Sequence, residues 1–150
     1  MTSSTSGSQQ AEHPEGWIHR YPLRVQFDEV DQYGIVHHPR YFVYFERARV
    51  ELMGTLGMRP GRPDTDGLGI IVSSAQVKFW SSARFLDDLV VEQGCSQAGA
   101  SRTTLCYRIL RGDTLIASAE LVLAFVDDSG KPCRAPADIR EGLAGMGVPS

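Results

Sequence analysis

Asp31 stands a short distance before a predicted helix, and this spacing offers the clearest candidate for chemistry in the sequence. A carboxylate can attack a carbonyl carbon directly or activate the water that does so. We expect the helix to start near His38 or Pro39, because the missing N–H of proline costs nothing at the first helical position. Unpaired N–H groups at a helix start are fixed donors to charge developing on a carbonyl oxygen. Gly34 gives the connecting turn its backbone freedom, so that carboxylate and amides can lie on opposite sides of one carbonyl carbon.

Each candidate residue also has a structural interpretation, and both stay open at this point. An aspartate before a helix is often an N-cap or a turn former, which applies to Asp31. His38 could be a structural histidine, and Tyr41 could belong to the core. Phe79 could line an acyl or aryl pocket or fill the interior of a strand. Six arginines of the second half could include a phosphate clamp, and the sequence does not choose among them.

The surrounding pattern predicts the elements that must position these residues. Alternating apolar residues predict a first strand over residues 21–30. From the predicted start, apolar residues at helical spacing continue to Gly54 or Gly57 and occupy nearly all sides of the helix, as in a helix enclosed by the fold or by a partner subunit. Residues 58–69 hold three glycines and two prolines and are predicted to form a loop. Further strands are predicted over 70–80, 85–97, 102–110 and 114–126, and a short terminal helix over 137–145.

These elements predict an α+β fold in which five antiparallel strands surround one helix. The connections between the last four strands are short, which favours antiparallel hairpins over parallel crossovers. A five-stranded sheet buries a face only against another layer, and the available layer is the long apolar helix. The expected architecture is the hotdog fold, a five-stranded antiparallel sheet wrapped around one long central helix.

Length and composition predict one domain without a membrane or nucleic-acid role. Residues 1–16 are almost devoid of apolar side chains and are expected to form a disordered tail, with a single domain over 17–150. The chain has no run of the roughly 20 apolar residues that span a bilayer, and no signal-peptide pattern, so we expect a cytoplasmic protein. A net charge of -3 disfavours binding to nucleic acid. The three cysteines lack the spacing of a metal site, and we expect neither a metal nor a cofactor.

The segment from Val25 to Leu52, VQFDEVDQYGIVHHPRYFVYFERARVEL, resembles the signature of the 4-hydroxybenzoyl-CoA thioesterase family and of the related Tol-Pal-associated acyl-CoA thioesterases. The match consists of a D-x-x-G-x-x-x-H-x-x-Y spacing joined to E-R-A-R. It extends more weakly over about residues 20 to 140. His37 departs from the pattern, since relatives often carry an aromatic or apolar residue there.

The resemblance implies a thioester hydrolase in which Asp31 is the nucleophile or the general base. The backbone N–H of His38 would be the principal donor to the oxyanion, and its side chain would hold the loop or the substrate. The residues that would contact the substrate are Tyr33, Gly34, Ile35, Val36, Tyr41 and Phe79. The substrate would be an acyl-CoA or an acyl-carrier-protein thioester, with acyl-CoA favoured. The resemblance also implies a homodimer at minimum and a homotetramer as the common assembly.

Other function classes fit the sequence less well. Enoyl-thioester hydratases of the same fold resemble a pattern in which an aspartate is followed by four residues and then a histidine, whereas that position after Asp31 is Val36. A serine hydrolase would need a G-x-S-x-G elbow, and no such pentapeptide occurs in the chain. A noncatalytic acyl-thioester-binding protein would be expected to lose the acidic residue, which is present here.

Overall fold

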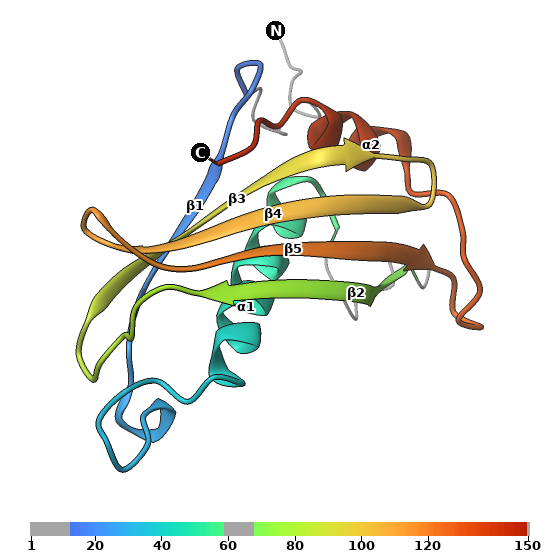
Figure 1. Ribbon diagram of the computed structural model, residues 1–150. Coiled ribbons are helices and arrows are strands. Elements are labelled where there is room, and N and C mark those ends of the chain that lie inside the picture. Colours follow the sequence, from blue (N-terminus) through green and yellow to red (C-terminus); the bar gives the residue numbers. More distant parts are fainter. Residues whose placement is uncertain (1–12, 59–67, 150) are drawn as a thin grey trace, which may run out of the picture.

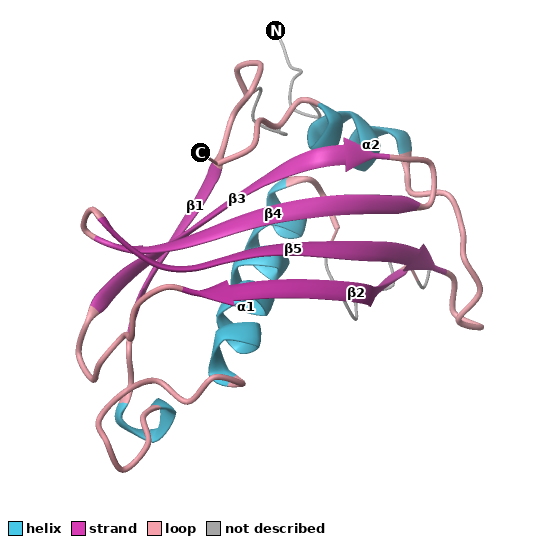
Figure 2. Cartoon of the chain, in the orientation of Figure 1, coloured by secondary structure: helices cyan, strands magenta, loops and turns pink. Residues whose placement is uncertain are grey.

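A computed structural model describes residues 13–58 and 68–149 of the chain. The strands are β1 (His19–Arg24), β2 (Gly69–Phe79), β3 (Asp88–Ala98), β4 (Arg102–Arg111) and β5 (Thr114–Val126), and the helices are η2 (Phe27–Glu29), α1 (Arg40–Thr55) and α2 (Ala137–Ala144). The five strands form one antiparallel sheet in the order β1-β3-β4-β5-β2. Figure 1 shows α1 crossing one face of this sheet, and Figure 2 shows the short α2 beside the end of β3.

The structure confirms the antiparallel five-stranded sheet, but the helical layer differs from the prediction. Helix α1 has 16 residues and buries Tyr41, Tyr44, Phe45, Ala48, Leu52 and Met53. The expectation of one long central helix is not confirmed, because α2 also contributes two buried residues, Ile139 and Leu143. Within one protomer the fold encloses one face of α1, and Phe42 and Val50 on the other are nearly half exposed. Enclosure of that face by a partner subunit stays a prediction.

No helix among residues 13–58 and 68–149 is long and apolar enough to cross a membrane. Of the predicted tail, residues 1–12 lie outside the described residues, and Gly16 at its end donates a backbone hydrogen bond to Gly145. Most of the predicted loop, residues 59–67, also lies outside them.

The first strand is shorter than predicted. Strand β1 ends at Arg24, which pairs with Asp88 at the start of β3, and beyond that point Val25 is bonded only to the turn that precedes β3. Phe27 to Glu29 instead form a 3₁₀ turn, closed by a hydrogen bond from the Gln26 backbone N–H to Glu29 Oε1 at 2.8 Å. The period-two pattern therefore misplaces Phe27, which is 77% exposed, whereas Glu29, at the same parity, is 2% exposed.

The start of β3 also differs from the predicted strand over 85–97. Residues 84–87 form a turn in which Arg84 N–H donates to Asp87 Oδ2 at 2.8 Å. Leu86 has a φ of 70°, a left-handed conformation that a strand cannot contain. The backbone N–H of Leu86 donates to Val25 O, which ties this turn to the segment leading to Asp31.

A buried polar cluster joins β1, β3 and the middle of α1. Gln93 Nε2 donates to the Ala48 carbonyl at 2.6 Å and also faces His19 Nδ1 at 2.9 Å. Because a carbonyl only accepts, this contact fixes the orientation of the amide, and His19 Nδ1 must be the acceptor. His19 Nε2 therefore carries the proton and donates it to Glu51 Oε1 at 2.9 Å. The cluster requires a neutral His19.

We expect this cluster to make stability fall in mild acid. Burial lowers the pKa of His19 from its ordinary 6.5, although Glu51 acts in the opposite direction. The unfolded chain therefore takes up the proton more readily than the folded one. The contribution of His19 is complete above about pH 6.5 and is lost as the pH falls toward the lowered pKa. Urea unfolding between pH 8 and pH 5 should show this loss in the wild type and a smaller one in His19→Gln. An equal dependence of the free energy of unfolding on pH in both proteins would contradict it.

Candidate active site

Asp31 lies in a tight turn that closes on itself before α1 begins. Asp31 N–H donates to the Ile35 carbonyl at 2.9 Å, and Gly34 N–H donates to the Asp31 carbonyl at 2.9 Å. Val30 and Val36 form an antiparallel bridge at the base of the turn. Gly34 has a φ of +79°, so the predicted need for a glycine here is confirmed. We call residues 30–36 the Asp31 turn.

The Asp31 carboxylate combines a structural role with a free oxygen. Its Oδ1 accepts from the backbone N–H groups of Tyr33 at 2.8 Å and Ile35 at 3.4 Å. Asp31 is thus a turn former, as the structural interpretation proposed. Its Oδ2 has no hydrogen-bond partner in the part of the chain that the structure describes. One oxygen therefore holds the turn while the other can act on a bound molecule.

The start of α1 leaves one backbone donor free near this turn. The N–H groups of Arg40, Tyr41 and Phe42 donate to the carbonyls of residues 37, 38 and 39, in 3₁₀ fashion. Pro39 has no N–H. The N–H of His38 has no partner among residues 13–58 and 68–149. Most amides of the helix start are thus already used, and the His38 N–H is the one left for an oxyanion.

An aromatic wall borders the His38 side of the turn. The exposed His38 ring stacks on Phe79, with a centroid distance of 4.4 Å and an interplanar angle of 15°. Phe79 also contacts Tyr41 at 5.3 Å between centroids. Tyr41 is 1% exposed, and its hydroxyl accepts a hydrogen bond from Ala83 N–H at 3.3 Å. Burial raises the pKa of Tyr41, so this side chain stays protonated near neutral pH and belongs to the wall.

The structure brings most of the predicted site residues together and leaves one apart. Ile35 forms a bridge with Arg84, and Val36 N–H donates to the Ala83 carbonyl at 2.8 Å, which docks the Asp31 turn against the residues that follow β2. Tyr33, by contrast, is 74% exposed. Within one protomer its side chain does not line an enclosed pocket.

The analysis of the sequence missed a buried carboxylate beside the turn. Glu29 accepts a hydrogen bond from the Tyr44 hydroxyl at 3.0 Å, and its Oε2 lies 3.4 Å from Arg47 Nη1. A signal was present, because Glu29 has the same strand parity as the apolar Leu23 and Val25. A charged residue at an apolar position of a strand pattern indicates either that the strand has ended or that the charge has a buried partner.

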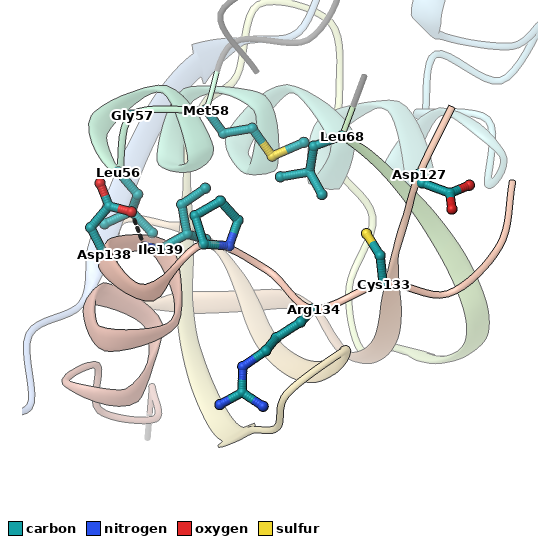
Figure 3. A pocket seen from close by; sticks show the side chains of 10 residues that line it. Leu56, Gly57, Met58, Leu68, Asp127, Cys133, Arg134, Asp138 and Ile139 are labelled. Carbon is teal, nitrogen blue, oxygen red and sulfur yellow. Dashed lines mark hydrogen bonds between the residues drawn. The ribbon is translucent and has the colours of Figure 1, made fainter. Parts of the chain in front are cut away.

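A separate hollow lies at the opposite end of α1. It has a volume of about 380 Å³, and Figure 3 shows Leu56, Met58 and Ile139 around it together with Cys133 and Arg134. None of the predicted site residues lines it. Its charged lining residues Asp127, Arg134 and Asp138 come from the chain after β5, whereas the Asp31 turn precedes α1.

Two further hollows, of about 360 and 310 Å³, flank Glu46 and Arg49 between α1 and the sheet. We call them together the α1–β2 groove. Its large apolar lining residues are Phe42, Val43, Val50, Met53, Met58, Leu68, Ile70, Val72 and Leu121.

The antiparallel sheet over a helix, with an acidic turn at the helix start, agrees with the hotdog fold expected from the sequence. The family model of the Thioesterase-like superfamily matches residues 25–143, and the chain belongs to this family. The prediction of a thioester hydrolase is confirmed at this level.

Individual relatives agree with this assignment. The acyl-CoA thioesterase YbgC of Haemophilus influenzae is 28% identical over 122 residues, which cover 80% of this chain and 90% of that protein. A putative esterase of Aquifex aeolicus is 30% identical over 123 residues, covering 82% and 95%. Among solved structures, a probable thioesterase from Bartonella henselae superposes with a TM-score of 0.74 at 26% identity, covering 79% of this chain and 99% of that one.

Proposed function

We propose that the chain is a cytoplasmic acyl-CoA thioesterase that hydrolyses its substrate to a free acid and coenzyme A, with Asp31 as nucleophile or general base. One observation carries this proposal: the Asp31 turn holds a free carboxylate oxygen on Asp31, and the helix start seven residues later holds the free N–H of His38. A carbonyl carbon held between them would meet an attacking group on one side and a donor to its oxygen on the other.

The two roles of Asp31 differ in their first step. As a nucleophile, Oδ2 forms a bond to the thioester carbon and expels the thiolate, and water then hydrolyses the mixed anhydride. As a general base, Oδ2 takes a proton from water, whose oxygen forms the new bond while the thiolate leaves and is protonated. In both routes the His38 N–H stabilises the tetrahedral oxyanion. The exposed Phe79 and His38 rings would flank the acyl group.

The acyl carrier is proposed from the relatives and from chemistry. Coenzyme A and acyl carrier protein present the same pantetheine arm, so the Asp31 turn itself does not discriminate between them. The Haemophilus influenzae relative bears the name acyl-CoA thioesterase, which favours coenzyme A. Carrier-protein thioesters are therefore the second substrate class to assay.

The proposal is tested by incubating the purified protein with short, long and aromatic acyl-CoA thioesters and measuring release of free thiol. Hydrolysis of at least one member by the wild type supports the proposal. Hydrolysis of acyl-carrier-protein thioesters alone would replace the substrate class. Failure with both classes would point to a noncatalytic acyl-thioester-binding protein.

We also propose a homodimer, with the homotetramer that the family resemblance implies as its further assembly. Strand β2 lies at the edge of the sheet and pairs only with β5, so one side of its 11 residues has no strand partner within the described residues. Phe42, Val50, Ile71 and Val72 are large apolar side chains on α1 and β2, each between 44% and 51% exposed. A long exposed edge beside apolar side chains is a surface that proteins normally cover. A second copy related by a two-fold axis would pair β2 with β2 and cover the α1–β2 groove.

A further inference from the structure

Glu29 is the one buried carboxylate among the described residues, and the proposed mechanism does not use it. It is 2% exposed and lies two residues before Asp31. Burying a carboxylate is costly unless hydrogen bonds and an opposite charge compensate it. The partners that compensate Glu29 show what this residue holds together.

The side chain of Glu29 joins the segment before the Asp31 turn to the first two turns of α1. Its Oε1 accepts from the Gln26 backbone N–H at 2.8 Å and from the Tyr44 hydroxyl at 3.0 Å. Its Oε2 lies 3.4 Å from Arg47 Nη1. Burial, together with the Glu29 carboxylate, raises the pKa of Tyr44, so that its hydroxyl remains a donor. Tyr44 and Arg47 are three apart and lie on the same helical face.

The backbone of Glu29 holds the other end of the same turn. Its carbonyl accepts a hydrogen bond from His37 N–H at 3.0 Å. Residues 30–36 are thus enclosed between the two residues of this hydrogen bond, and His38, with its free N–H, follows directly. Glu29 is therefore bonded to α1 through its side chain and, through its backbone carbonyl, to His37, the neighbour of the oxyanion donor His38.

We propose that Glu29 is a positioning residue that sets the separation between the Asp31 carboxylate and the His38 N–H through its contacts with Tyr44, Arg47 and His37. It does not touch substrate and acts through Asp31. Catalysis depends on this separation, because misplacing a reacting group by about 1 Å can cost up to roughly a hundredfold in rate.

Glu29→Gln is the sharpest variant for testing this role. The glutamine oxygen can keep both contacts of Oε1, with the Gln26 N–H and the Tyr44 hydroxyl, so the segment can still fold. Its amide group, however, is a donor and would face the donor groups of Arg47, where the carboxylate had accepted. We expect the contact with Arg47 to be lost, which removes one of the two side-chain links from residue 29 to α1 and loosens the backbone that holds His37. Tyr44→Phe removes a single hydrogen bond and should have the same effect to a smaller degree.

Glu51→Gln is the matched control. Like Glu29, Glu51 links two elements, because this residue of α1 accepts a hydrogen bond from His19 Nε2 of β1 at 2.9 Å. It lies more than two helical turns beyond Arg40, and its side chain makes no hydrogen bond or ion pair with the Asp31 turn. Loss of this contact should lower the free energy of unfolding without altering the site.

Because this inference rests on the proposed function, the experiment includes Asp31→Asn and the double variant Glu29→Gln/Asp31→Asn. With the best acyl-CoA substrate, we expect Glu29→Gln to lower kcat about tenfold or more and to change KM less than about twofold. Glu51→Gln should keep the wild-type kcat. In single-turnover measurements, the double variant should be no slower than Asp31→Asn alone, since a residue that acts through Asp31 has nothing left to position.

Three results would overturn the inference. The first is a kcat for Glu29→Gln equal to that of Glu51→Gln. The second is a loss of single-turnover rate in the double variant that equals the product of the two single losses. The third is a loss of kcat that urea unfolding explains by a fraction of unfolded Glu29→Gln protein. In each of them an inactive Asp31→Asn leaves the proposed function standing. A fully active Asp31→Asn would instead reject the Asp31 mechanism, and the role of Glu29 with it.

Discussion

Asp31→Asn should lower thioester hydrolysis by at least about two orders of magnitude while leaving the protein folded. Asparagine keeps a carbonyl oxygen that can accept from the N–H groups of Tyr33 and Ile35, as Oδ1 of Asp31 does. The Asp31 turn should therefore persist. The second position becomes an uncharged NH₂, which neither attacks a carbonyl carbon nor accepts a proton from water. The loss of a positioned base or nucleophile is typically on this scale.

The measurement is kcat and KM from thiol release, alongside urea unfolding of the same samples. Asp28→Asn is the matched control, because Asp28 is an exposed carboxylate only three residues away, and its side chain makes no hydrogen bond or ion pair with residues 13–58 and 68–149. It should retain wild-type turnover. Undiminished hydrolysis by Asp31→Asn, or an equal loss in both variants, would refute the catalytic role of Asp31.

Val72→Glu should convert the proposed dimer to monomers and remove most of the activity with it. Val72 lines the α1–β2 groove beside Phe42 and Arg49 and is 44% exposed in the single protomer. If a second copy covers this groove, each new carboxylate would be buried in a hollow where Glu46 competes for Arg49, at a cost of several kcal/mol. We expect activity to fall as well, because the resemblance to the 4-hydroxybenzoyl-CoA thioesterase family implies an active site between two subunits.

Sedimentation or light scattering at micromolar concentration gives the mass of the assembly, and thiol release gives the activity. Val148→Glu is the control, since Val148 is 51% exposed on the C-terminal segment and does not line the groove. It should leave mass and turnover unchanged. A wild-type mass near that of one chain, or an intact active dimer in Val72→Glu, would reject this surface as the interface.

Local patterns in the sequence predicted the elements closely where neighbours along the chain decide the conformation. Strand β5 spans Thr114–Val126, as the predicted strand did, and α1 begins directly after Pro39. The need for a glycine at position 34 was also readable, because the positive φ of a tight turn is a local requirement. The spacing of Asp31, Gly34, His38 and Tyr41 indicated the family before any contact was known.

The end of the first strand was decided by a distant partner. The alternation of apolar residues continues past Arg24, but the ladder stops where β3 begins at Asp88, 64 residues away in the sequence. The chain then turns, exposing Phe27 and burying Glu29. Periodicity describes one strand alone and carries no information about where its neighbour ends.

The amino-acid sequence by itself determined which residue types stand at the Asp31 turn and which elements flank it. The resemblance named Asp31 and His38, but the tertiary structure alone decided that Asp31 Oδ2 and the His38 N–H have no partner among residues 13–58 and 68–149. It also decided that Glu29 is bonded to α1. The physical reason is that turns and helix starts are set by interactions within a few residues. The partners of a buried or free polar group depend on how segments distant in sequence pack together.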